Sequence, residues 1–325
     1  MTTTCLRLRP YRYPSYVGHH STRVPRTLGR ERFPPIVAHI HHLPFPEEPM
    51  PPDYELQSYW NARFENEHHF EWLGDGSDTI LPYVRSYLSK SRASGQSSPS
   101  HPSRLLHIGA GTSSLAERIR ELYKDTYGHE ANEEAIVHTD FAENLVARMQ
   151  ERESSLAKGS PGKGMLWLCV DIMQWGDVQG ALASGGEDAQ GVFDVVVDKS
   201  TSDAISCRED AVLTSKDRCL HPAFNEYLAA HKGQTINLAP VEILAVHLAS
   251  LVHPGGLWVA LTFSSNRFAF LSSPEATNPT MSPRASQYWL VEDIKTIDAP
   301  TGMEGSGYAP VVQHYVFLLR RKDSR

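Results

Sequence analysis

Long apolar runs are absent from this chain of 325 residues. No run approaches the roughly 20 residues of a membrane-spanning helix, so the sequence predicts a soluble protein with no membrane partner. Cysteine is scarce, and the four cysteines (5, 169, 207 and 219) form neither CxxC pairs nor a dense framework, which is typical of reduced thiols inside a cell. The net charge of −7 argues against a nucleic-acid binder, which needs concentrated Lys and Arg. A Walker-type GxxxxGK[ST] motif is also missing, which disfavours an ATPase.

The N-terminal part lacks acidic side chains and apolar periodicity. Residues 1–30 contain six Arg and no Asp or Glu, a bias shared by organelle transit peptides. Three prolines in the same stretch argue against a continuous amphipathic helix. We therefore predict a disordered leader over 1–50 in a cytoplasmic protein, with a mitochondrial location as the minority alternative. The HIHH run at 39–42 is proline-flanked and has no nearby partners, so we predict that it is solvated and that the protein has no metal site.

Ordered structure is expected from Tyr54, in YELQSYWNARFENEHHFEWLGDG (54–76). Its aromatic residues alternate with charged ones, as in short helices that cap a larger domain. The following SKSRASGQSSPSHPS (89–103) is rich in Ser and predicts a flexible loop or linker. These features divide the chain into an N-terminal cap and linker over 51–104 and a main domain over 105–322.

From residue 105 onward, strand-like segments alternate with helix-like ones. Repeated βα units predict a mostly parallel sheet that is covered by helices on both faces. Two late strand-like runs, 287–294 and 314–319, have no clear helix between them and should form an antiparallel pair at the sheet edge. The other expected strands are 105–108, 136–139, 165–170, 193–197 and 257–262, and the expected helices are 113–123, 144–152 and 241–252.

The run LLHIGAGTSSL (105–115) changes from apolar residues to Gly109-Ala110-Gly111 and then to small polar residues. A turn at this place is where open α/β sheets bind ligands, because glycine lets the backbone approach a cofactor and the next helix offers free N–H groups to an anion. A dinucleotide fold would prefer Gly where this chain has Ser114, so GxGxxS is a weak signal by itself. A turn without a ligand is the alternative.

An aspartate ends each of three consecutive predicted strands: Asp140 in IVHTD, Asp171 in LWLCVD and Asp198 in FDVVVD. The carboxyl ends of parallel strands meet at one edge of a sheet, so these carboxylates should line the same rim as the glycine turn. Each could instead cap a helix. Asp140 could accept two ribose hydroxyl hydrogens and Asp171 an adenine amino hydrogen. Together with a helix N-terminus for a carboxylate, the set fits S-adenosylmethionine.

Six ordered blocks resemble the seven-strand (class I) S-adenosylmethionine-dependent methyltransferases, and among them the elongation factor 1-alpha lysine methyltransferase group. The specific blocks are VFDVVVDKSTSDAIS (192–206), similar to FDVVxxKGTLDAL, and the pair YWxxRF (59–64) and EWLGDG (71–76). The resemblance covers roughly residues 54–322. Its remaining blocks are the glycine turn, HPGGLWVALT (253–262), and the late GSGY (305–308) and HYVFLLRR (314–321).

The resemblance implies an α/β fold with a Rossmann-like, seven-stranded, mostly parallel sheet whose last strand is antiparallel, and S-adenosylmethionine as the cofactor. It also implies which positions hold that cofactor. By position, these are Gly109, Asp140 and Phe141 at the methionine and ribose ends, with Gly111 in the same turn; Asp171 and Ile172 at the adenine; Lys199 beside the site; and Trp60, Phe64 and Trp72 over it.

The sequence differs in several places from the elongation factor 1-alpha lysine methyltransferase group that it resembles. Ala110 and Thr112 stand where Cys and Asn are usual, and these changes should be tolerated by the cofactor. Ser200 and Ser202 stand where Gly and Leu are usual, nearer the acceptor side. The stretch 207–240 is longer than in the group and is expected near the acceptor mouth. It could narrow the site for a small molecule, dock a protein or form a surface loop.

We predict in-line methyl transfer to a protein lysine, for example in a translation factor. The alternatives are a small-molecule methyltransferase of secondary metabolism and a non-catalytic cofactor-binding module; a dinucleotide-dependent oxidoreductase is the weakest. The sulfonium is already activated, so the protein mainly aligns the reactants and excludes water. Asp198 is our candidate catalytic residue, to position the amine, with a helix cap as its alternative role. Lys199 could instead pair with Asp198 or Asp203.

Overall fold

The structure is a computed structural model that describes residues 52–156, 164–182, 192–272, 283–299 and 312–323. The predicted leader over 1–50 and the GSGY block lie outside the described residues. From Asp53 onward the chain forms one unit by its internal contacts. Within the described ranges, none of the helices combines the length and the apolar character needed to span a bilayer.

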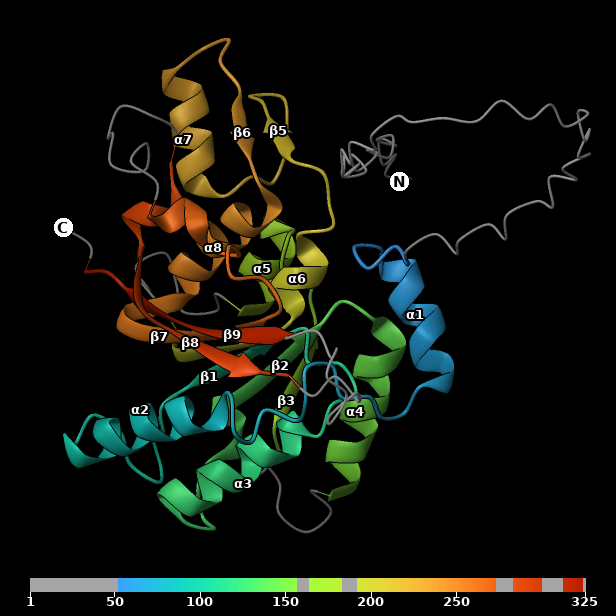
Figure 1. Cartoon of the computed structure of the whole chain (residues 1–325), viewed down its shortest axis with the longest axis vertical. Helices are drawn as coiled ribbons and strands as arrows, with labels where there is room; N and C mark the ends of the chain where they lie inside the picture. Colours follow the sequence, from blue (N-terminus) through green and yellow to red (C-terminus); the bar gives the residue numbers. More distant parts are fainter. Residues whose placement is uncertain (1–51, 157–163, 183–191, 273–282, 300–311, 324–325) are drawn as a thin grey trace, which may run out of the picture. The chain divides into compact units, whose positions relative to one another are not determined.

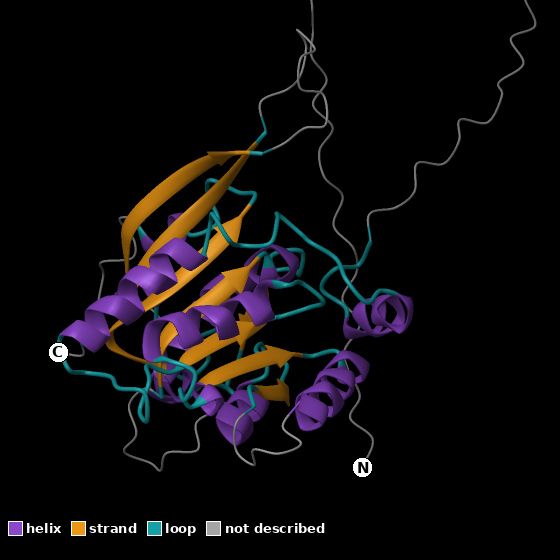
Figure 2. Ribbon diagram, turned by 90° about the horizontal axis from the view of Figure 1, so that it is seen from below, coloured by secondary structure: helices purple, strands orange, loops and turns teal. Residues whose placement is uncertain are grey.

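A seven-stranded sheet forms the centre of this unit, with helices on both of its faces (Figure 1 and Figure 2). The strand order is β3-β2-β1-β4-β7-β9-β8. The strands from β3 to β7 run parallel, and β9 is antiparallel to both of its neighbours. The predicted fold class is therefore confirmed. The strands are β1 (Leu105–Ile108), β2 (Ile136–Asp140), β3 (Leu166–Cys169), β4 (Phe193–Lys199), β7 (Val252–Thr262), β8 (Trp289–Asp298) and β9 (Gln313–Arg321).

Side chains of the central strands alternate between two hydrophobic cores. Leu106 and Ile108 join the core beneath α5 and α8, whereas Leu105 joins the core formed with α2 and α3. Both faces of β1 and β2 are buried, which explains their apolar residues. The buried histidines of the two strands, His107 and His138, contact each other, with their Nδ1 atoms 3.1 Å apart. The helices that cover the sheet are α2 (Leu81–Ala93), α3 (Leu115–Tyr127), α4 (Glu143–Leu156), α5 (Trp175–Leu182) and α8 (Pro240–Leu251), and α1 (Gln57–Asn66) packs against α4.

The late strand-like runs form the predicted antiparallel pair, β8 and β9. One detail differs from the prediction: β9 lies between β7 and β8, so β8 alone of the two is at the edge. Strand β7 also begins at Val252, earlier than predicted, because Val252 pairs with Phe193 of β4 before the register shifts across the HPGG segment.

The Ser-rich segment 89–103 is not the flexible loop that its composition predicted. Its first residues belong to α2, and Ser91, Ser97 and Ser103 are buried. The Ser91 hydroxyl donates to Ser97 Oγ at 3.0 Å and accepts from Ser103 Oγ at 3.0 Å. Composition misled the prediction because small hydroxyl side chains are tolerated in a core once they hydrogen-bond to one another.

The long stretch 207–240 is folded and packs on the main body. It contains β5 (Ala211–Leu213), α7 (Pro222–Ala230) and β6 (Ile236–Leu238), and β5 and β6 form a separate antiparallel pair. Phe224, Leu228 and Ile236 are buried in the same core as α8. In Figure 1 this unit lies above α8. We call residues 207–238 the inserted unit.

Candidate functional site

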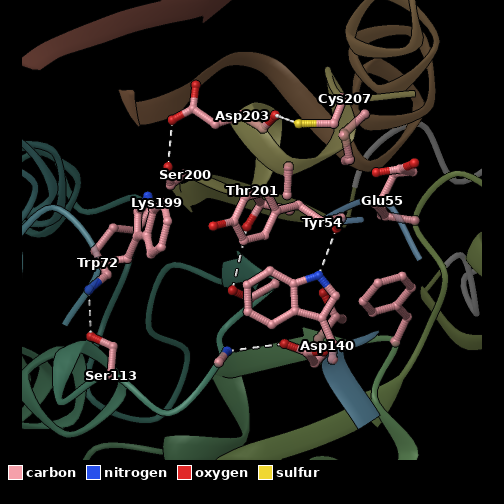
Figure 3. Close-up of a pocket in the computed structure, with 18 of the residues that line it drawn as sticks. Tyr54, Glu55, Trp72, Ser113, Asp140, Lys199, Ser200, Thr201, Asp203 and Cys207 are labelled. Carbon is pink, nitrogen blue, oxygen red and sulfur yellow. Dashed lines mark hydrogen bonds between the residues drawn. The ribbon is translucent and has the colours of Figure 1, made fainter. Parts of the chain in front are cut away.

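A cavity of about 240 Å³ lies at the carboxyl ends of β1, β2, β3 and β4 (Figure 3). The structure brings all of the predicted cofactor-binding residues together in its wall. Their role in binding stays a prediction. They are Trp60, Phe64, Trp72, Gly109, Gly111, Asp140, Phe141, Asp171, Ile172 and Lys199.

Asp140 is buried at the end of β2 and faces the glycine turn. Its carboxylate accepts hydrogen bonds from the backbone N–H groups of Gly111 at 3.1 Å and Ala142 at 3.0 Å. Burial raises the pKa of Asp140 to about 6, although these N–H groups act in the opposite direction. The group is therefore mostly ionised at neutral pH and retains lone pairs for further donors.

The glycine turn after β1 needs its two glycines for different reasons. Gly109 and Gly111 both have left-handed backbones, with φ of +53° and +58°. A Cβ at Gly109 would lie 2.3 Å from Thr201 Oγ1, so a side chain cannot fit there without moving α6 (Thr201–Ile205). A Cβ at Gly111 would meet nothing within 4 Å. The space beside Gly111 is therefore open to a ligand that approaches the backbone.

The sequence led us to expect that the N-terminus of α3 would be free to bind a carboxylate of the cofactor. The structure shows that it is already occupied. Glu71 occupies it: Glu71 Oε1 accepts from Ser114 N at 2.8 Å, and Glu71 Oε2 accepts from Ser113 Oγ at 2.7 Å. Burial alone would raise the pKa of Glu71, but hydrogen bonds from Ser114, Lys199 and Ser113 lower it to about 2. Our sequence reasoning missed this residue, although it stands directly before Trp72 in the specific EWLGDG block.

Lys199 completes the same cluster from the end of β4. Its ammonium donates to Glu71 Oε2 at 2.9 Å, Gly74 O at 2.7 Å and Ser113 Oγ at 2.8 Å. All three protons are thus used, and the predicted alternative pairing with Asp198 or Asp203 is wrong. The cluster ties the segment 71–74 to the glycine-turn side of the cavity.

Aromatic side chains from the N-terminal segment cover the cavity. The Tyr54 ring lies 6.0 Å from that of Trp60 and 5.6 Å from that of Trp72, and Trp60 lies 5.5 Å from Phe64. The indole N–H of Trp60 donates to the Tyr54 carbonyl at 2.7 Å. Tyr54 was not among the predicted site residues. Its position at the start of the aromatic segment could have identified it as one.

Asp198 does not lie where a group that positions the acceptor would lie. It is fully buried and is absent from the cavity wall. Its Oδ1 accepts from Thr201 N at 2.9 Å and Ser202 N at 3.2 Å, so it caps the first turn of α6. Burial raises its pKa to about 7. Because β4 side chains alternate, Lys199 faces the cavity while Asp198 faces the start of α6.

Asp203 is the carboxylate of this block that does line the cavity. Arg267 Nε and Nη2 donate to Asp203 Oδ1 at 2.9 and 2.7 Å, and the Phe263 N–H donates to Oδ2 at 3.3 Å. The Ser200 hydroxyl also donates to Asp203. Ser200 has a left-handed backbone with φ of +67°, a conformation that glycine adopts more readily than serine. These bonds fix Phe263 at the cavity wall.

The described residues contain no group of three or more His, Cys, Asp or Glu side chains that is arranged to hold a metal ion. Asp171 is half-buried, and its Oδ1 accepts from the Met173 N–H at 3.0 Å. The neighbouring Ile172 is buried and shares the cavity wall with it.

Comparison with known proteins gives one sequence relative and several structures of low similarity. No family model matches the chain. Methyltransferase srdJ of Neurospora crassa is 27% identical over 274 residues, which cover 84% of this chain and 87% of the relative. The N-methyltransferase NodS of Bradyrhizobium japonicum WM9, in complex with S-adenosyl-L-homocysteine, is 12% identical, with 83% of this chain and 99% of that chain covered and a TM-score of 0.37. Magnesium protoporphyrin IX methyltransferase ChlM of Synechocystis PCC 6803, with bound SAM, is 10% identical, with 85% and 100% covered and a TM-score of 0.40.

These TM-scores are too low to indicate which substrate the chain acts on. None of the three proteins supports the more specific resemblance to the elongation factor 1-alpha lysine methyltransferases. The fold is established by the strands themselves. Five parallel strands are followed in the sheet by β9, which is antiparallel and lies between β7 and β8. The chain therefore has the fold of a class I S-adenosylmethionine-dependent methyltransferase.

Proposed function

We propose that this chain is an S-adenosylmethionine-dependent methyltransferase that acts on the amine of a protein lysine. The observation that carries the proposal is the cavity at the carboxyl ends of the parallel strands, with the buried Asp140 carboxylate and the open side of Gly111 in one wall. The sequence relative, which is named a methyltransferase, supports the reaction type.

The residues that are present fit the cofactor. Asp140 keeps acceptor capacity for two ribose hydroxyls, and the backbone beside Gly111 leaves room for the methionine end. Asp171 and Ile172 would lie against the adenine. When bound, S-adenosylmethionine supplies a methyl group on a positively charged sulfur that needs no further activation. The protein then has to hold, align and desolvate the two reactants.

The charge of the cavity wall supports an amine as the acceptor. Its acidic residues are Glu55, Glu67, Asp140, Asp171 and Asp203, whereas its basic residues are Lys199 and Arg208. Lys199 pairs with Glu71, Glu67 with Arg63 and Asp203 with Arg267, and Asp171 lies 3.9 Å from Arg208. Among the wall carboxylates, Glu55 and Asp140 have no ion pair with another described residue, and this remaining negative charge favours a cationic group. Glu55 and the ring of Tyr54 face α6 from the N-terminal segment (Figure 3). In place of Asp198, these two residues are our candidates to position an ammonium group.

The aromatic cover favours a second candidate function. Contacts among Tyr54, Trp60, Phe64 and Trp72 form a continuous apolar surface over the cavity. Such a cover suits a small molecule that becomes fully enclosed, so methylation of a small-molecule amine is the alternative. Both candidates use the same cofactor site and differ in what reaches the acceptor side.

The first experiment is calorimetric titration of the purified chain with S-adenosylhomocysteine, with NAD and ATP as controls. We expect one-site binding of S-adenosylhomocysteine alone and loss of that binding in Asp140→Asn, whose amide oxygen can still accept from a backbone N–H of the turn, at a nearly unchanged melting temperature. A cell lysate is then incubated with the protein and a radiolabelled methyl donor. Label in acid-precipitated protein supports a lysine acceptor, and label in the soluble fraction alone supports a small molecule. Absence of S-adenosylhomocysteine binding would contradict the proposal and leave a non-catalytic module.

A further inference from the structure

Two contacts converge on the loop 171–173: one from His247 of α8, whose ring stacks on His221 of the inserted unit, and one from Arg208 at the start of the inserted unit. We infer that α8 and the inserted unit together hold this loop in place, and that His247 and Arg208 are positioning residues for the adenine side of the cavity. The inference rests on the proposed function for the identity of the ligand. It assigns to the long 207–238 stretch a role that differs from all three alternatives that its sequence left open.

The first contact passes through two stacked histidines. His221 caps α7, and its Nδ1 accepts from Ala223 N at 3.2 Å, so its proton is on Nε2 and is donated to Ser250 Oγ at 2.7 Å. The His221 ring stacks on that of His247, with centroids 5.9 Å apart and an interplanar angle of 24°. His247 Nδ1 donates to the carbonyl of Ile172 at 2.9 Å. Ile172 itself lines the cavity.

His247 is unusual for its position. It lies in the middle of α8, whose neighbouring side chains Val246 and Leu248 are buried and apolar, and it is itself 3% exposed. A leucine would pack there without a polar group to satisfy, whereas a buried imidazole has to make its hydrogen bond. Its partner is the carbonyl of a loop residue in the cavity wall, 75 positions away in the sequence. This placement indicates that the imidazole serves the loop rather than the helix.

The second contact comes from the beginning of the inserted unit, on the cavity side of the loop. Arg208 lines the cavity, and its guanidinium lies 3.9 Å from the Asp171 carboxylate. The same group donates to the carbonyl of Glu55 at 3.2 Å, which connects it to the segment before α1. The loop is therefore held from the core by His247 and from the cavity by Arg208.

The loop 171–173 should affect the binding of one part of the cofactor, its adenine base. Asp171 and Ile172 are the residues that we expect to flank the adenine, whereas Asp140 and the glycine turn serve the ribose and methionine ends. A displaced loop should therefore weaken recognition of the adenine amino group while leaving the rest of the site intact. Loss of base selectivity is a readout that general destabilisation would not produce.

The test compares three variants of the full chain. His247→Leu removes the donor, His247→Asn restores an N–H close to the position of Nδ1, and His231→Asn alters an exposed histidine of the inserted unit as a control. Affinities for S-adenosylhomocysteine and S-inosylhomocysteine are measured by calorimetry. We expect His247→Leu to lose about tenfold in affinity for the adenine compound, the value of one hydrogen bond, and less than twofold for the inosine compound. His247→Asn and His231→Asn should stay close to the wild type.

Amide hydrogen exchange of the unliganded protein separates this inference from the proposed function. We expect His247→Leu to speed exchange at residues 171–174, where Gln174 N donates to the Asp171 carbonyl at 2.8 Å, and His231→Asn to leave it unchanged. If the wild type binds neither nucleoside, the proposed function fails and the exchange data still test the loop. Unchanged exchange, or equal losses of affinity for both compounds, would overturn the inference.

Discussion

Replacing Glu71 with Gln removes the negative charge with which Lys199 is paired at 2.9 Å. The pKa of Glu71 is lowered from 4.5 to about 2, which at about 1.36 kcal/mol per pKa unit gives an upper value of about 3 kcal/mol for the ionised form. Because the Glu71 side chain is 23% exposed, solvent screening reduces this value. The Lys199 side chain is 4% exposed and would retain a poorly compensated charge. We expect Glu71→Gln to lower the free energy of unfolding by about 2 kcal/mol.

The assay is urea denaturation at pH 7, with Asp75→Asn as the matched control. Asp75 lies on the same segment and pairs with Arg118 at 2.6 Å, but both side chains are more than a third exposed. Loss of this ion pair in Asp75→Asn should therefore lower the free energy of unfolding by less than about 1 kcal/mol. The pH dependence gives a second check. A carboxyl group whose pKa is lowered in the folded protein stabilises the fold at pH values above its pKa in the unfolded chain. The difference in the free energy of unfolding between the wild type and Glu71→Gln should therefore be constant above pH 5 and shrink as pH falls from 4.5 toward 2. Equal losses in both variants would refute the reasoning.

Three further predictions concern the glycine turn and the strand ends. Ionised Asp140 should bind the ribose best, so affinity for S-adenosylhomocysteine should fall as pH drops below about 6, and Asp140→Asn should bind weakly at every pH; a pH-independent wild type would contradict this. Gly109→Ala should destabilise the fold by about 2 kcal/mol or more in thermal melting, because the new methyl group would clash with Thr201, and an unchanged melting temperature would show that α6 can move. The raised pKa of Asp198 means that its own contribution to stability falls as pH rises from 4 to 7, so in urea denaturation the free energy of unfolding of Asp198→Asn should gain on that of the wild type over this range; a constant difference would contradict this.

Much of the fold could be predicted from the sequence because its signals are local. Strand β1 is apolar except for His107 and is buried on both faces, and the spacing of apolar residues in α8 predicted both of its ends within a residue. The ring of site residues followed from the same pattern, since parallel strands place Gly109, Asp140 and Asp171 at one edge of the sheet.

The remaining features depend on contacts between distant residues. Glu71 and Lys199 are 128 positions apart, and no local pattern indicates that the carboxylate takes the N-terminus of α3. The roles of Asp198 and Asp203 could not be separated, because their directions depend on the strand register and on the left-handed turn at Ser200. His247 carried no signal, since one polar residue in an apolar helix does not reveal which backbone carbonyl it meets.

The position of β9 has a consequence for the biosynthesis of the protein. Among the described strands, β8 joins the sheet through β9, which follows it in the chain. Until residues 313–321 leave the ribosome, β7 presents an open edge that includes the apolar run from Leu257 to Leu261. Such an edge is a template for pairing with other chains. A premature stop codon before Gln313 should therefore yield a product that aggregates or is degraded rather than one that retains a smaller functional sheet.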